Sequence, residues 1–145
     1  MKNILIIEDA VVFSRSISNW LKKKGMATGH VSTLSAARKE LQVKKFDLVL
    51  ADLRLPDGSS MELLKWMKGK YYSIPFLIMT SYGQVENAVE AMQLGASNYL
   101  CKPVQPDRLW EVIEKEFSRP QHGSTEFYRG ESEKAREMYR LIGPV

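Results

Sequence analysis

The sequence predicts an α/β fold in which successive strand–helix units build one parallel sheet. Three observations support this prediction. Short apolar runs recur along residues 2–117, and each is followed by a segment whose apolar residues have helical spacing. The first run, at residues 4–7, is apolar at every position, as a strand buried on both faces requires. Five such units can be distinguished, so a five-stranded sheet is expected.

The first unit begins with the strand at residues 4–7. In the following helix, one apolar stripe is expected to face the sheet, and it contains Phe13, Ile17, Trp20 and Leu21. Lysines at residues 22–24 complement the negative end of the helix dipole, and Gly25 can supply the C-cap. The first helix is therefore expected to end just before Gly25.

The second unit has the weakest strand. Residues 26–31 have fewer apolar side chains than the other strands, which favours a position at the edge of the sheet. Ser32 or Thr33 is expected to cap the next helix. The apolar face of that helix contains Leu34, Ala37 and Leu41.

The third unit contains the segment FDLVLADLRLPDGSS, residues 46–60. Only Asp47 interrupts the apolar run at residues 46–51, and the run then ends on Asp52. The turn LPDG follows, and Ser59 or Ser60 is expected to cap the next helix. The apolar face of this helix contains Leu63, Leu64 and Met67.

The last two units complete the sheet. Pro75 opens the fourth strand, FLIM, which ends on Thr80 and Ser81. The helix after it closes at Gly95, and its apolar face contains Val85, Ala88, Val89 and Met92. The fifth strand, NYLC, is followed by a helix that begins at Pro106, with an apolar face made of Leu109, Val112, Ile113 and Phe117.

The helical and strand periodicity ends near residue 117, so the domain is expected to cover residues 1–117. Residues 118–127 gather Pro, Gly, Ser and Thr, which predicts a linker. Residues 128–145 contain GESEKAREMYRLI, which has the spacing of one further amphipathic helix. A single helix of this kind needs a partner to be stable.

The composition excludes several classes of protein. No apolar run is long enough to cross a membrane, and the N-terminus turns acidic too early for a secretory signal, which predicts a cytoplasmic protein without membrane contact. The net charge is +4, but the lysines are scattered over helix ends, so direct nucleic-acid binding is not expected. The one cysteine, Cys101, excludes an internal disulfide and is expected to be a small buried hydrophobe.

Polar side chains follow four of the five predicted strands: Glu8 and Asp9 the first, Asp52 the third, Thr80 the fourth and Lys102 the fifth. Because the carboxyl ends of parallel strands meet at one edge of a sheet, we expect these side chains to line one crevice. Each alone can be explained as a helix-start acid, a turn residue, an N-cap or a surface amine. Their coincidence at one edge favours a functional site.

The chemistry of this set indicates a metal-assisted reaction with phosphate. Carboxylates brought close together repel one another unless a cation lies among them. Oxygen ligands without His or Cys suit Mg²⁺, so Glu8, Asp9 and Asp52 are predicted to bind it. Asp52 can then act as a nucleophile towards a phosphoryl donor. Lys102 and Thr80 are predicted to supply a positive charge and a hydroxyl to the phosphoryl oxygens.

The motifs ILIIED, DLVLADLRLPDGSSMELL, FLIMTSYG and GASNYLCKPV resemble, in order and spacing, the receiver domain of bacterial two-component response regulators. The resemblance implies a (βα)5 flavodoxin-like, doubly wound sheet of strand order 2-1-3-4-5. It implies that Asp52 is the phosphoacceptor, that Glu8, Asp9 and Asp52 are Mg²⁺ ligands, and that the main-chain carbonyl of Arg54 completes the protein ligands. Glu8 departs from the family pattern, since many members have Asp there.

The resemblance also implies a conformational switch. Thr80 and Lys102 would contact the phosphoryl group, and the Lys102–Pro103 peptide bond would be cis. Tyr99 would be the aromatic switch residue, although from the residues alone it is equally a half-buried strand tyrosine. The phosphoryl donor would be a sensor histidine kinase. Phosphorylation would change the face at residues 84–117, which would pair with another copy of the chain or with a downstream ATPase domain, and a homodimer is expected. The protein would be a regulatory phosphoacceptor that catalyses only its own phosphorylation and dephosphorylation.

The tail has a resemblance of its own. GESEKAREMYRLI is similar to the opening of the AAA+ ATPase domain in sigma-54-dependent, NtrC-like transcription activators. Residues 128–145 would then be the truncated start of that ATPase domain or a linker helix, because the chain contains no G-x-x-x-x-G-K-[ST] phosphate loop. The downstream ATPase and DNA-binding domains are the partners that this resemblance implies.

Three other functions stay open at this stage. A flavin-binding protein of the flavodoxin sort would need a Ser/Thr/Gly-rich phosphate loop where the chain has Glu8 and Asp9. An aspartate-nucleophile phosphatase would have a D-x-D motif after the first strand, where the chain has EDA. A receiver that is never phosphorylated would act as a constitutive protein-interaction module, and the complete set of site residues argues against this option.

Overall fold

The computed structural model describes residues 1–70, 72–81 and 85–118. Its main sheet is parallel and consists of β1 (Asn3–Ile7), β2 (Ala27–Val31), β3 (Leu48–Asp52), β6 (Phe76–Thr80) and β7 (Asn98–Cys101). The strands lie in the order β2-β1-β3-β6-β7, which is the order expected from the resemblance. The α/β fold class is confirmed, and the weakest strand, β2, lies at an edge as predicted.

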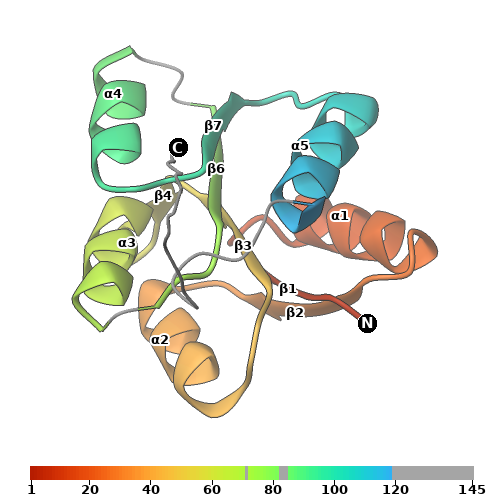
Figure 1. The fold of residues 1–145 in the computed structure, drawn as a ribbon, viewed down its shortest axis with the longest axis horizontal. Helices are drawn as coiled ribbons and strands as arrows, with labels where there is room; N and C mark the ends of the chain where they lie inside the picture. Colours follow the sequence, from red (N-terminus) through yellow and green to blue (C-terminus); the bar gives the residue numbers. More distant parts are fainter. Residues whose placement is uncertain (71, 82–84, 119–145) are drawn as a thin grey trace, which may run out of the picture. The chain divides into compact units, whose positions relative to one another are not determined.

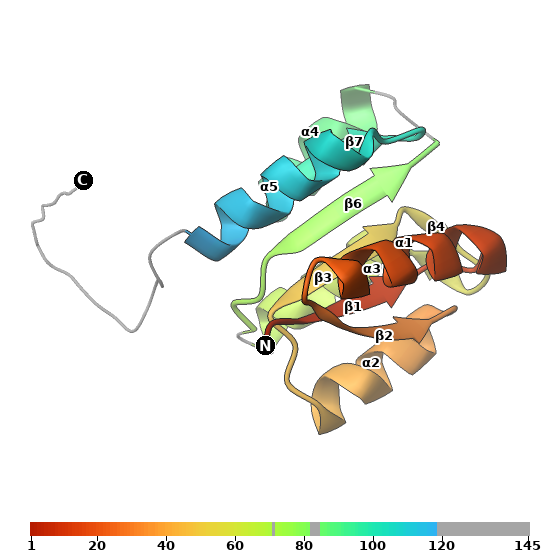
Figure 2. The same ribbon diagram turned by 90° about the vertical axis from the view of Figure 1, so that its right-hand side faces the viewer.

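Helices cover both faces of this sheet. They are α1 (Val11–Lys23), α2 (Leu34–Val43), α3 (Ser60–Gly69), α4 (Val85–Gln93) and α5 (Pro106–Ser118). Figures 1 and 2 show α2, α3 and α4 on one face, and α1 with the Pro106–Val112 part of α5 on the other. Among the described helices, none combines the length and the apolar character that a membrane span needs.

The chain divides into two compact units, Met1–Val112 and Ile113–Val145. In the second unit only the end of α5, up to Ser118, is described. The remainder of the expected linker at 118–127, and all of the tail expected at 128–145, lie outside the described residues.

The helix ends follow from local sequence. Thr33 caps α2, since its hydroxyl accepts a hydrogen bond of 3.1 Å from the backbone N–H of Ala36, and Ser59 caps α3 in the same way. The structure therefore decides between the alternative caps in both cases. Gly25 and Gly95 follow α1 and α4 with φ of 87° and 102°, a region that other residues rarely adopt. Both predicted glycine C-terminal positions are confirmed.

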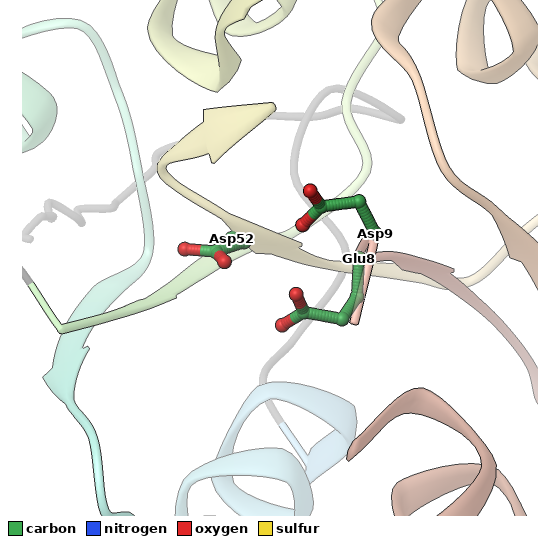
Figure 3. A group of neighbouring side chains, drawn as sticks. All are labelled: Glu8, Asp9 and Asp52. Atoms are coloured by element: carbon green, nitrogen blue, oxygen red, sulfur yellow. The ribbon is translucent and has the colours of Figure 1, made fainter. Parts of the chain in front are cut away.

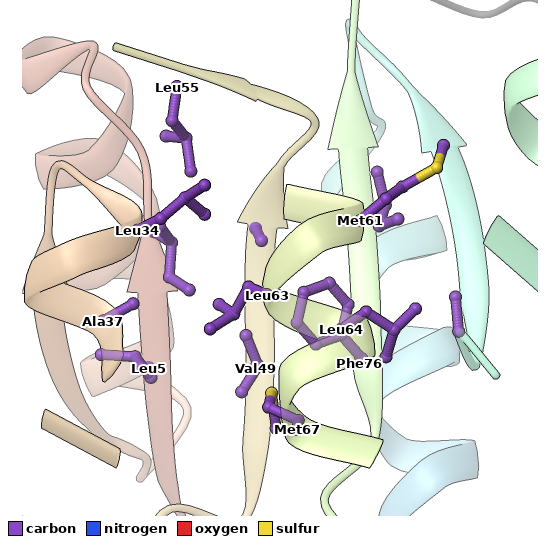
Figure 4. Close-up of a cluster of buried hydrophobic side chains, with 14 of the residues drawn as sticks. Leu5, Leu34, Ala37, Val49, Leu55, Met61, Leu63, Leu64, Met67 and Phe76 are labelled. Carbon is purple, nitrogen blue, oxygen red and sulfur yellow. The ribbon is translucent and has the colours of Figure 1, made fainter. Parts of the chain in front are cut away.

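The core lies mainly between the sheet and the helices α2, α3 and α4. Alternate residues of the central strands point to this face, where they pack against the apolar stripes of the helices (Figure 4). Leu5, Val49 and Phe76 are fully buried strand residues of this cluster. The fully buried central strands bring their carboxyl ends to one edge, and that edge is consequently a rigid base for a site.

Two details differ from the sequence prediction. The turn LPDG is a small antiparallel hairpin, in which β4 (Arg54–Leu55) pairs with β5 (Gly58–Ser59). Strands of two residues leave no periodicity to detect. The expectation that Cys101 is buried is wrong, because its side chain is exposed. Cys101 ends the edge strand β7, which has a neighbouring strand on one side only.

Candidate functional site

Three carboxylates meet at the carboxyl edge of the sheet. Glu8 and Asp9 directly follow β1, and Asp52 is the last residue of the neighbouring strand β3. One carboxylate oxygen from each lies within 4.8 Å of the others. In Figure 3 the side chains of Glu8 and Asp9 extend towards Asp52. The structure thus brings together the three residues that the sequence predicts as metal ligands.

The donor set fits a hard divalent cation. All three side-chain donors are carboxylate oxygens, the ligand type that Mg²⁺ prefers. Glu8 is buried, Asp52 is half-buried and Asp9 is exposed, so the cluster opens to solvent on one side. Mg²⁺ normally keeps several water ligands, and an open side leaves space for them. The residues therefore fit the Mg²⁺ that the sequence predicts.

Lys102 brings a positive charge to these carboxylates. Its Nζ donates a hydrogen bond of 2.7 Å to Glu8 Oε1 and one of 3.3 Å to Asp52 Oδ2. The side chains of Lys102 and Glu8 are 17% and 2% exposed, so this ion pair is largely removed from water. The Lys102–Pro103 peptide bond is cis, which confirms the prediction. Glu8, which stands where the resemblance implies an aspartate in many proteins, thus contacts the lysine through its carboxylate.

The pKa values of Glu8 and Lys102 are both raised, for different reasons. Burial raises the pKa of Glu8 above its ordinary value of 4.5, although the hydrogen bonds from Lys102 and from the Ala10 N–H lower it in part. Burial also lowers the pKa of the Lys102 ammonium, but the hydrogen bond to Glu8 and the charges of Glu8 and Asp52 outweigh it and raise this pKa. Lys102 therefore stays charged at neutral pH.

The raised pKa of Glu8 predicts that Mg²⁺ binding weakens as the pH falls. A proton and Mg²⁺ compete for the same carboxylate oxygens, so the affinity falls as pH falls through the raised pKa, above 4.5. Calorimetric titration with MgCl2 at about pH 7.5 and about pH 5.5 should give a weaker Kd at the lower pH. The Glu8→Gln variant should bind Mg²⁺ more weakly and lose part of this pH dependence. Equal pH dependence in the two proteins would contradict the assignment of Glu8.

Thr80 lies on β6, the strand next to the one that carries Asp52, and Tyr99 lies on the edge strand β7. Thr80 is the last residue of β6, not the residue after it, and it is fully buried. Its carbonyl accepts a 2.8 Å hydrogen bond from the Lys102 N–H, which ties the ends of β6 and β7 together. Tyr99 is half-buried and packs against the core beneath α4. Burial raises the pKa of Tyr99, and the Asn87 side chain of α4 partly offsets this effect.

Two further residues at the site were not identified from the sequence. Lys102 Nζ lies 4.3 Å from the centre of the Phe13 ring, within the range of a cation–π contact. His30 Nε2 lies 2.7 Å from the carbonyl oxygen of Glu8 and donates to it, because a carbonyl only accepts. Phe13 belongs to the apolar stripe of α1, so its spacing indicated only a core position. Its closeness to the acidic pair in sequence was the available signal.

A family model described as the response regulator receiver domain matches residues 4–114. Among curated proteins, the transcriptional regulatory protein ZraR of Salmonella typhimurium is 35% identical over 124 residues, which is 86% of this chain and 28% of ZraR. The response regulator protein PilR of Pseudomonas aeruginosa is 32% identical over 109 residues, 75% of this chain and 24% of PilR. The chain thus spans about a quarter of the length of these relatives.

Solved structures give the same result. The signal receiver domain of a LuxO repressor protein from Vibrio parahaemolyticus superposes with a TM-score of 0.76 at 29% identity, over 79% of this chain and 88% of that one. The beryllofluoride-activated NtrC4 receiver domain superposes with a TM-score of 0.77 at 27% identity, over 81% of this chain and 97% of that one. From its fold, its carboxylate cluster and these matches, the chain belongs to the response regulator receiver domain family.

Proposed function

We propose that this chain is a phosphoacceptor receiver, which takes a phosphoryl group from a sensor histidine kinase onto Asp52 in the presence of Mg²⁺. One observation carries the proposal. One carboxylate oxygen of Asp52 lies within 4.8 Å of one from Glu8 and one from Asp9, and Asp52 Oδ2 lies 3.3 Å from Lys102 Nζ. A nucleophilic carboxylate, a cation site and a lysine for the phosphoryl oxygens are the parts that phosphoryl transfer to aspartate requires.

In the proposed reaction, an oxygen of Asp52 attacks the phosphorus of a phosphohistidine. The new P–O bond forms as the P–N bond breaks, and the electron pair stays with the imidazole nitrogen. Bound Mg²⁺, held by Glu8, Asp9, Asp52 and the carbonyl of Arg54, would offset the negative charge of the carboxylates and the phosphoryl oxygens. Lys102 donates to a phosphoryl oxygen, and the hydroxyl of Thr80 donates to another.

The proposed switch uses the strand ends beside the site. The new phosphoryl oxygens attract the Thr80 hydroxyl, and its movement opens space behind it on the face of the sheet that α4 covers. Tyr99 lies on that face, two residues from the partner of Thr80 in the β6–β7 register, and its ring turns into the space. The packing of α4, β7 and α5 changes as a result, and the surface favours a new partner.

The partner proposed for this surface is a second copy of the chain. On α4, Val89 and Met92 are 50% and 49% exposed, and they line an apolar hollow of about 430 Å³ together with Ala88 and Gln93. Exposed apolar surface of this kind is typical of interaction sites. The similar NtrC4 receiver is a dimer in its beryllofluoride-activated form. Dimerisation through α4, β7 and α5 would bring two downstream domains together.

A charge on α4 is expected to weaken this dimer. With Mg²⁺ and beryllofluoride, the Val89→Asp variant should dimerise roughly thirtyfold more weakly than the wild-type chain, about 2 kcal/mol, because the aspartate would be buried unpaired. Sedimentation equilibrium measures this difference. Val43→Asp is the matched control, since Val43 is 73% exposed at the far end of α2. Equal loss of dimer in both variants would contradict the proposed surface.

In the full-length protein, the receiver is proposed to control a sigma-54-activating ATPase and, through it, transcription. The tail motif GESEKAREMYRLI and the similarity to transcriptional regulators support this part of the proposal. The histidine kinase and the downstream ATPase and DNA-binding domains are the proposed partners, in the cytoplasm. The receiver itself contacts neither DNA nor membrane in this proposal.

The direct test is incubation of the chain with Mg²⁺ and acetyl phosphate, followed by intact-mass measurement. One added phosphoryl group per chain is the expected result, with labelling that requires Mg²⁺. A chain that gains no phosphoryl group from acetyl phosphate or from any histidine kinase would instead be a constitutive protein-interaction receiver, and the phosphoacceptor proposal would fail.

A further inference from the structure

The hairpin β4/β5 carries the Arg54 carbonyl that the proposed function assigns to Mg²⁺. Each of its strands has only two residues, and Arg54 pairs with Ser59. A hairpin this short is not stable by itself, so contacts with the rest of the domain must hold it in place. The position of the Arg54 carbonyl therefore depends on where the hairpin is anchored.

The tip of the hairpin is anchored to α2 through Asp57. Asp57 Oδ1 accepts a 2.9 Å hydrogen bond from the Leu34 N–H, and Oδ2 accepts one of 3.1 Å from the Ser35 N–H. Both donors belong to the first turn of α2, where backbone N–H groups have no partner within the helix. Thr33 accepts from a different N–H, that of Ala36, so the two caps do not compete. The hydrogen bond from the Leu34 N–H is the main reason that the pKa of Asp57 lies below its usual value.

Apolar contacts hold the rest of the hairpin against the same helix. Leu55 is buried in the same apolar cluster as Leu34, and Figure 4 draws both side chains. At Gly58, a Cβ atom would lie 3.2 Å from Leu34 Cδ1, which shows how closely the backbone approaches α2. At the base, the Ser60 N–H donates a 2.8 Å hydrogen bond to the carbonyl of Leu53. The hairpin is thus fixed at its base, its middle and its tip.

We propose that Asp57 is a positioning residue for the metal site, which holds the Arg54 carbonyl in place by tying the hairpin tip to α2. The inference rests on the proposed function. Arg54 lies between the base anchor and the tip anchor, three residues from Asp57. Loss of both hydrogen bonds at the tip leaves only the base hydrogen bond and the apolar contacts of the middle, so the position of the Arg54 carbonyl is held less firmly. The side chain of Asp57 itself is not assigned to the metal.

Magnesium affinity distinguishes this role from simple helix capping. In calorimetric titrations of the full chain with MgCl2, Asp57→Ala should raise the Kd about tenfold, as loss of groups that orient metal ligands generally does. Thr33→Ala is the matched control, because it removes the other cap of α2 and leaves the hairpin contacts intact. It should lower the midpoint of urea unfolding to a similar extent and leave the Kd within about twofold of the wild type. Asp57→Asn, with one accepting oxygen, should lie between.

Several results would overturn the inference. A Kd for Asp57→Ala within about twofold of the wild type, or equal weakening in Thr33→Ala, would show that Asp57 acts only through the stability of α2. If Asp57→Ala does not fold, an unchanged Kd in Asp57→Asn has the same meaning. A wild-type chain that binds no Mg²⁺ would reject the metal site of the proposed function as well, whereas the first two results leave that function standing.

Discussion

Replacement of Asp52 by asparagine is expected to abolish phosphorylation of the chain. The amide has no anionic oxygen to attack phosphorus, so the loss should be complete and not a reduction in rate. Intact-mass measurement after incubation with Mg²⁺ and acetyl phosphate should show no added phosphoryl group. The fold should persist, because Lys102 keeps its shorter ion pair, that with Glu8 at 2.7 Å.

A matched control separates the acceptor from general effects of removing a carboxylate. Asp107 is exposed in the first turn of α5, and Asp107→Asn should be labelled to the same extent as the wild type. Labelling of Asp52→Asn at the wild-type level would move the acceptor to another residue. Loss of labelling in both variants would show that removal of a carboxylate has a general effect on the chain, and it would not support Asp52 as the acceptor.

Replacement of Lys102 by methionine is expected to destabilise the metal-free chain by about 3 kcal/mol, because it leaves a buried carboxylate without its partner. The Glu8 side chain is 2% exposed, so water cannot replace the lost ammonium. Urea unfolding at neutral pH measures the difference. Lys44→Met is the control, since Lys44 pairs with Glu40 at 3.5 Å with side chains that are 61% and 31% exposed. That exposed pair should contribute less than about 1 kcal/mol.

The double variant Glu8→Gln/Lys102→Met tests the reason for this loss. If the penalty comes from an unpaired buried charge, removal of both charges should restore part of the stability, with a coupling of about 2 kcal/mol. Strictly additive effects would show that the lysine contributes through its methylene groups and its contact with Phe13. Addition of Mg²⁺ should stabilise the Lys102→Met variant, because the metal supplies positive charge to the same carboxylates.

The main features of the fold can be predicted from apolar patterns within short stretches of the sequence. The apolar run at residues 4–7 and the spacing of Phe13, Ile17 and Leu21 are consequences of burial, so they predict a central strand and a sheet-facing helix. The meeting of Glu8, Asp9 and Asp52 could also be predicted, because these residues lie at the carboxyl ends of parallel strands, which share one edge of the sheet.

The partners of these residues could not be predicted in the same way. The Lys102–Glu8 pair joins residues 94 positions apart. The residues around Glu8 in the sequence do not indicate that its side chain contacts a lysine. Asp57 was recognised only as a turn residue, because its acceptors face a helix that lies earlier in the chain. The exposure of Cys101 depends on its place at the end of an edge strand, which is a tertiary property. Each of these features is decided by packing across the domain.

The edge position of β7 would allow this strand to move while the rest of the sheet keeps its hydrogen bonds. This strand is hydrogen-bonded on one side only, to β6. It contains Tyr99, and Lys102 follows its last residue directly. A displacement of β7 therefore strains a single ladder of hydrogen bonds, while the interior strands keep their neighbours on both sides. In the proposed switch, a change at Asp52 would therefore reach the surface through the edge of the sheet, while the interior strands stay paired.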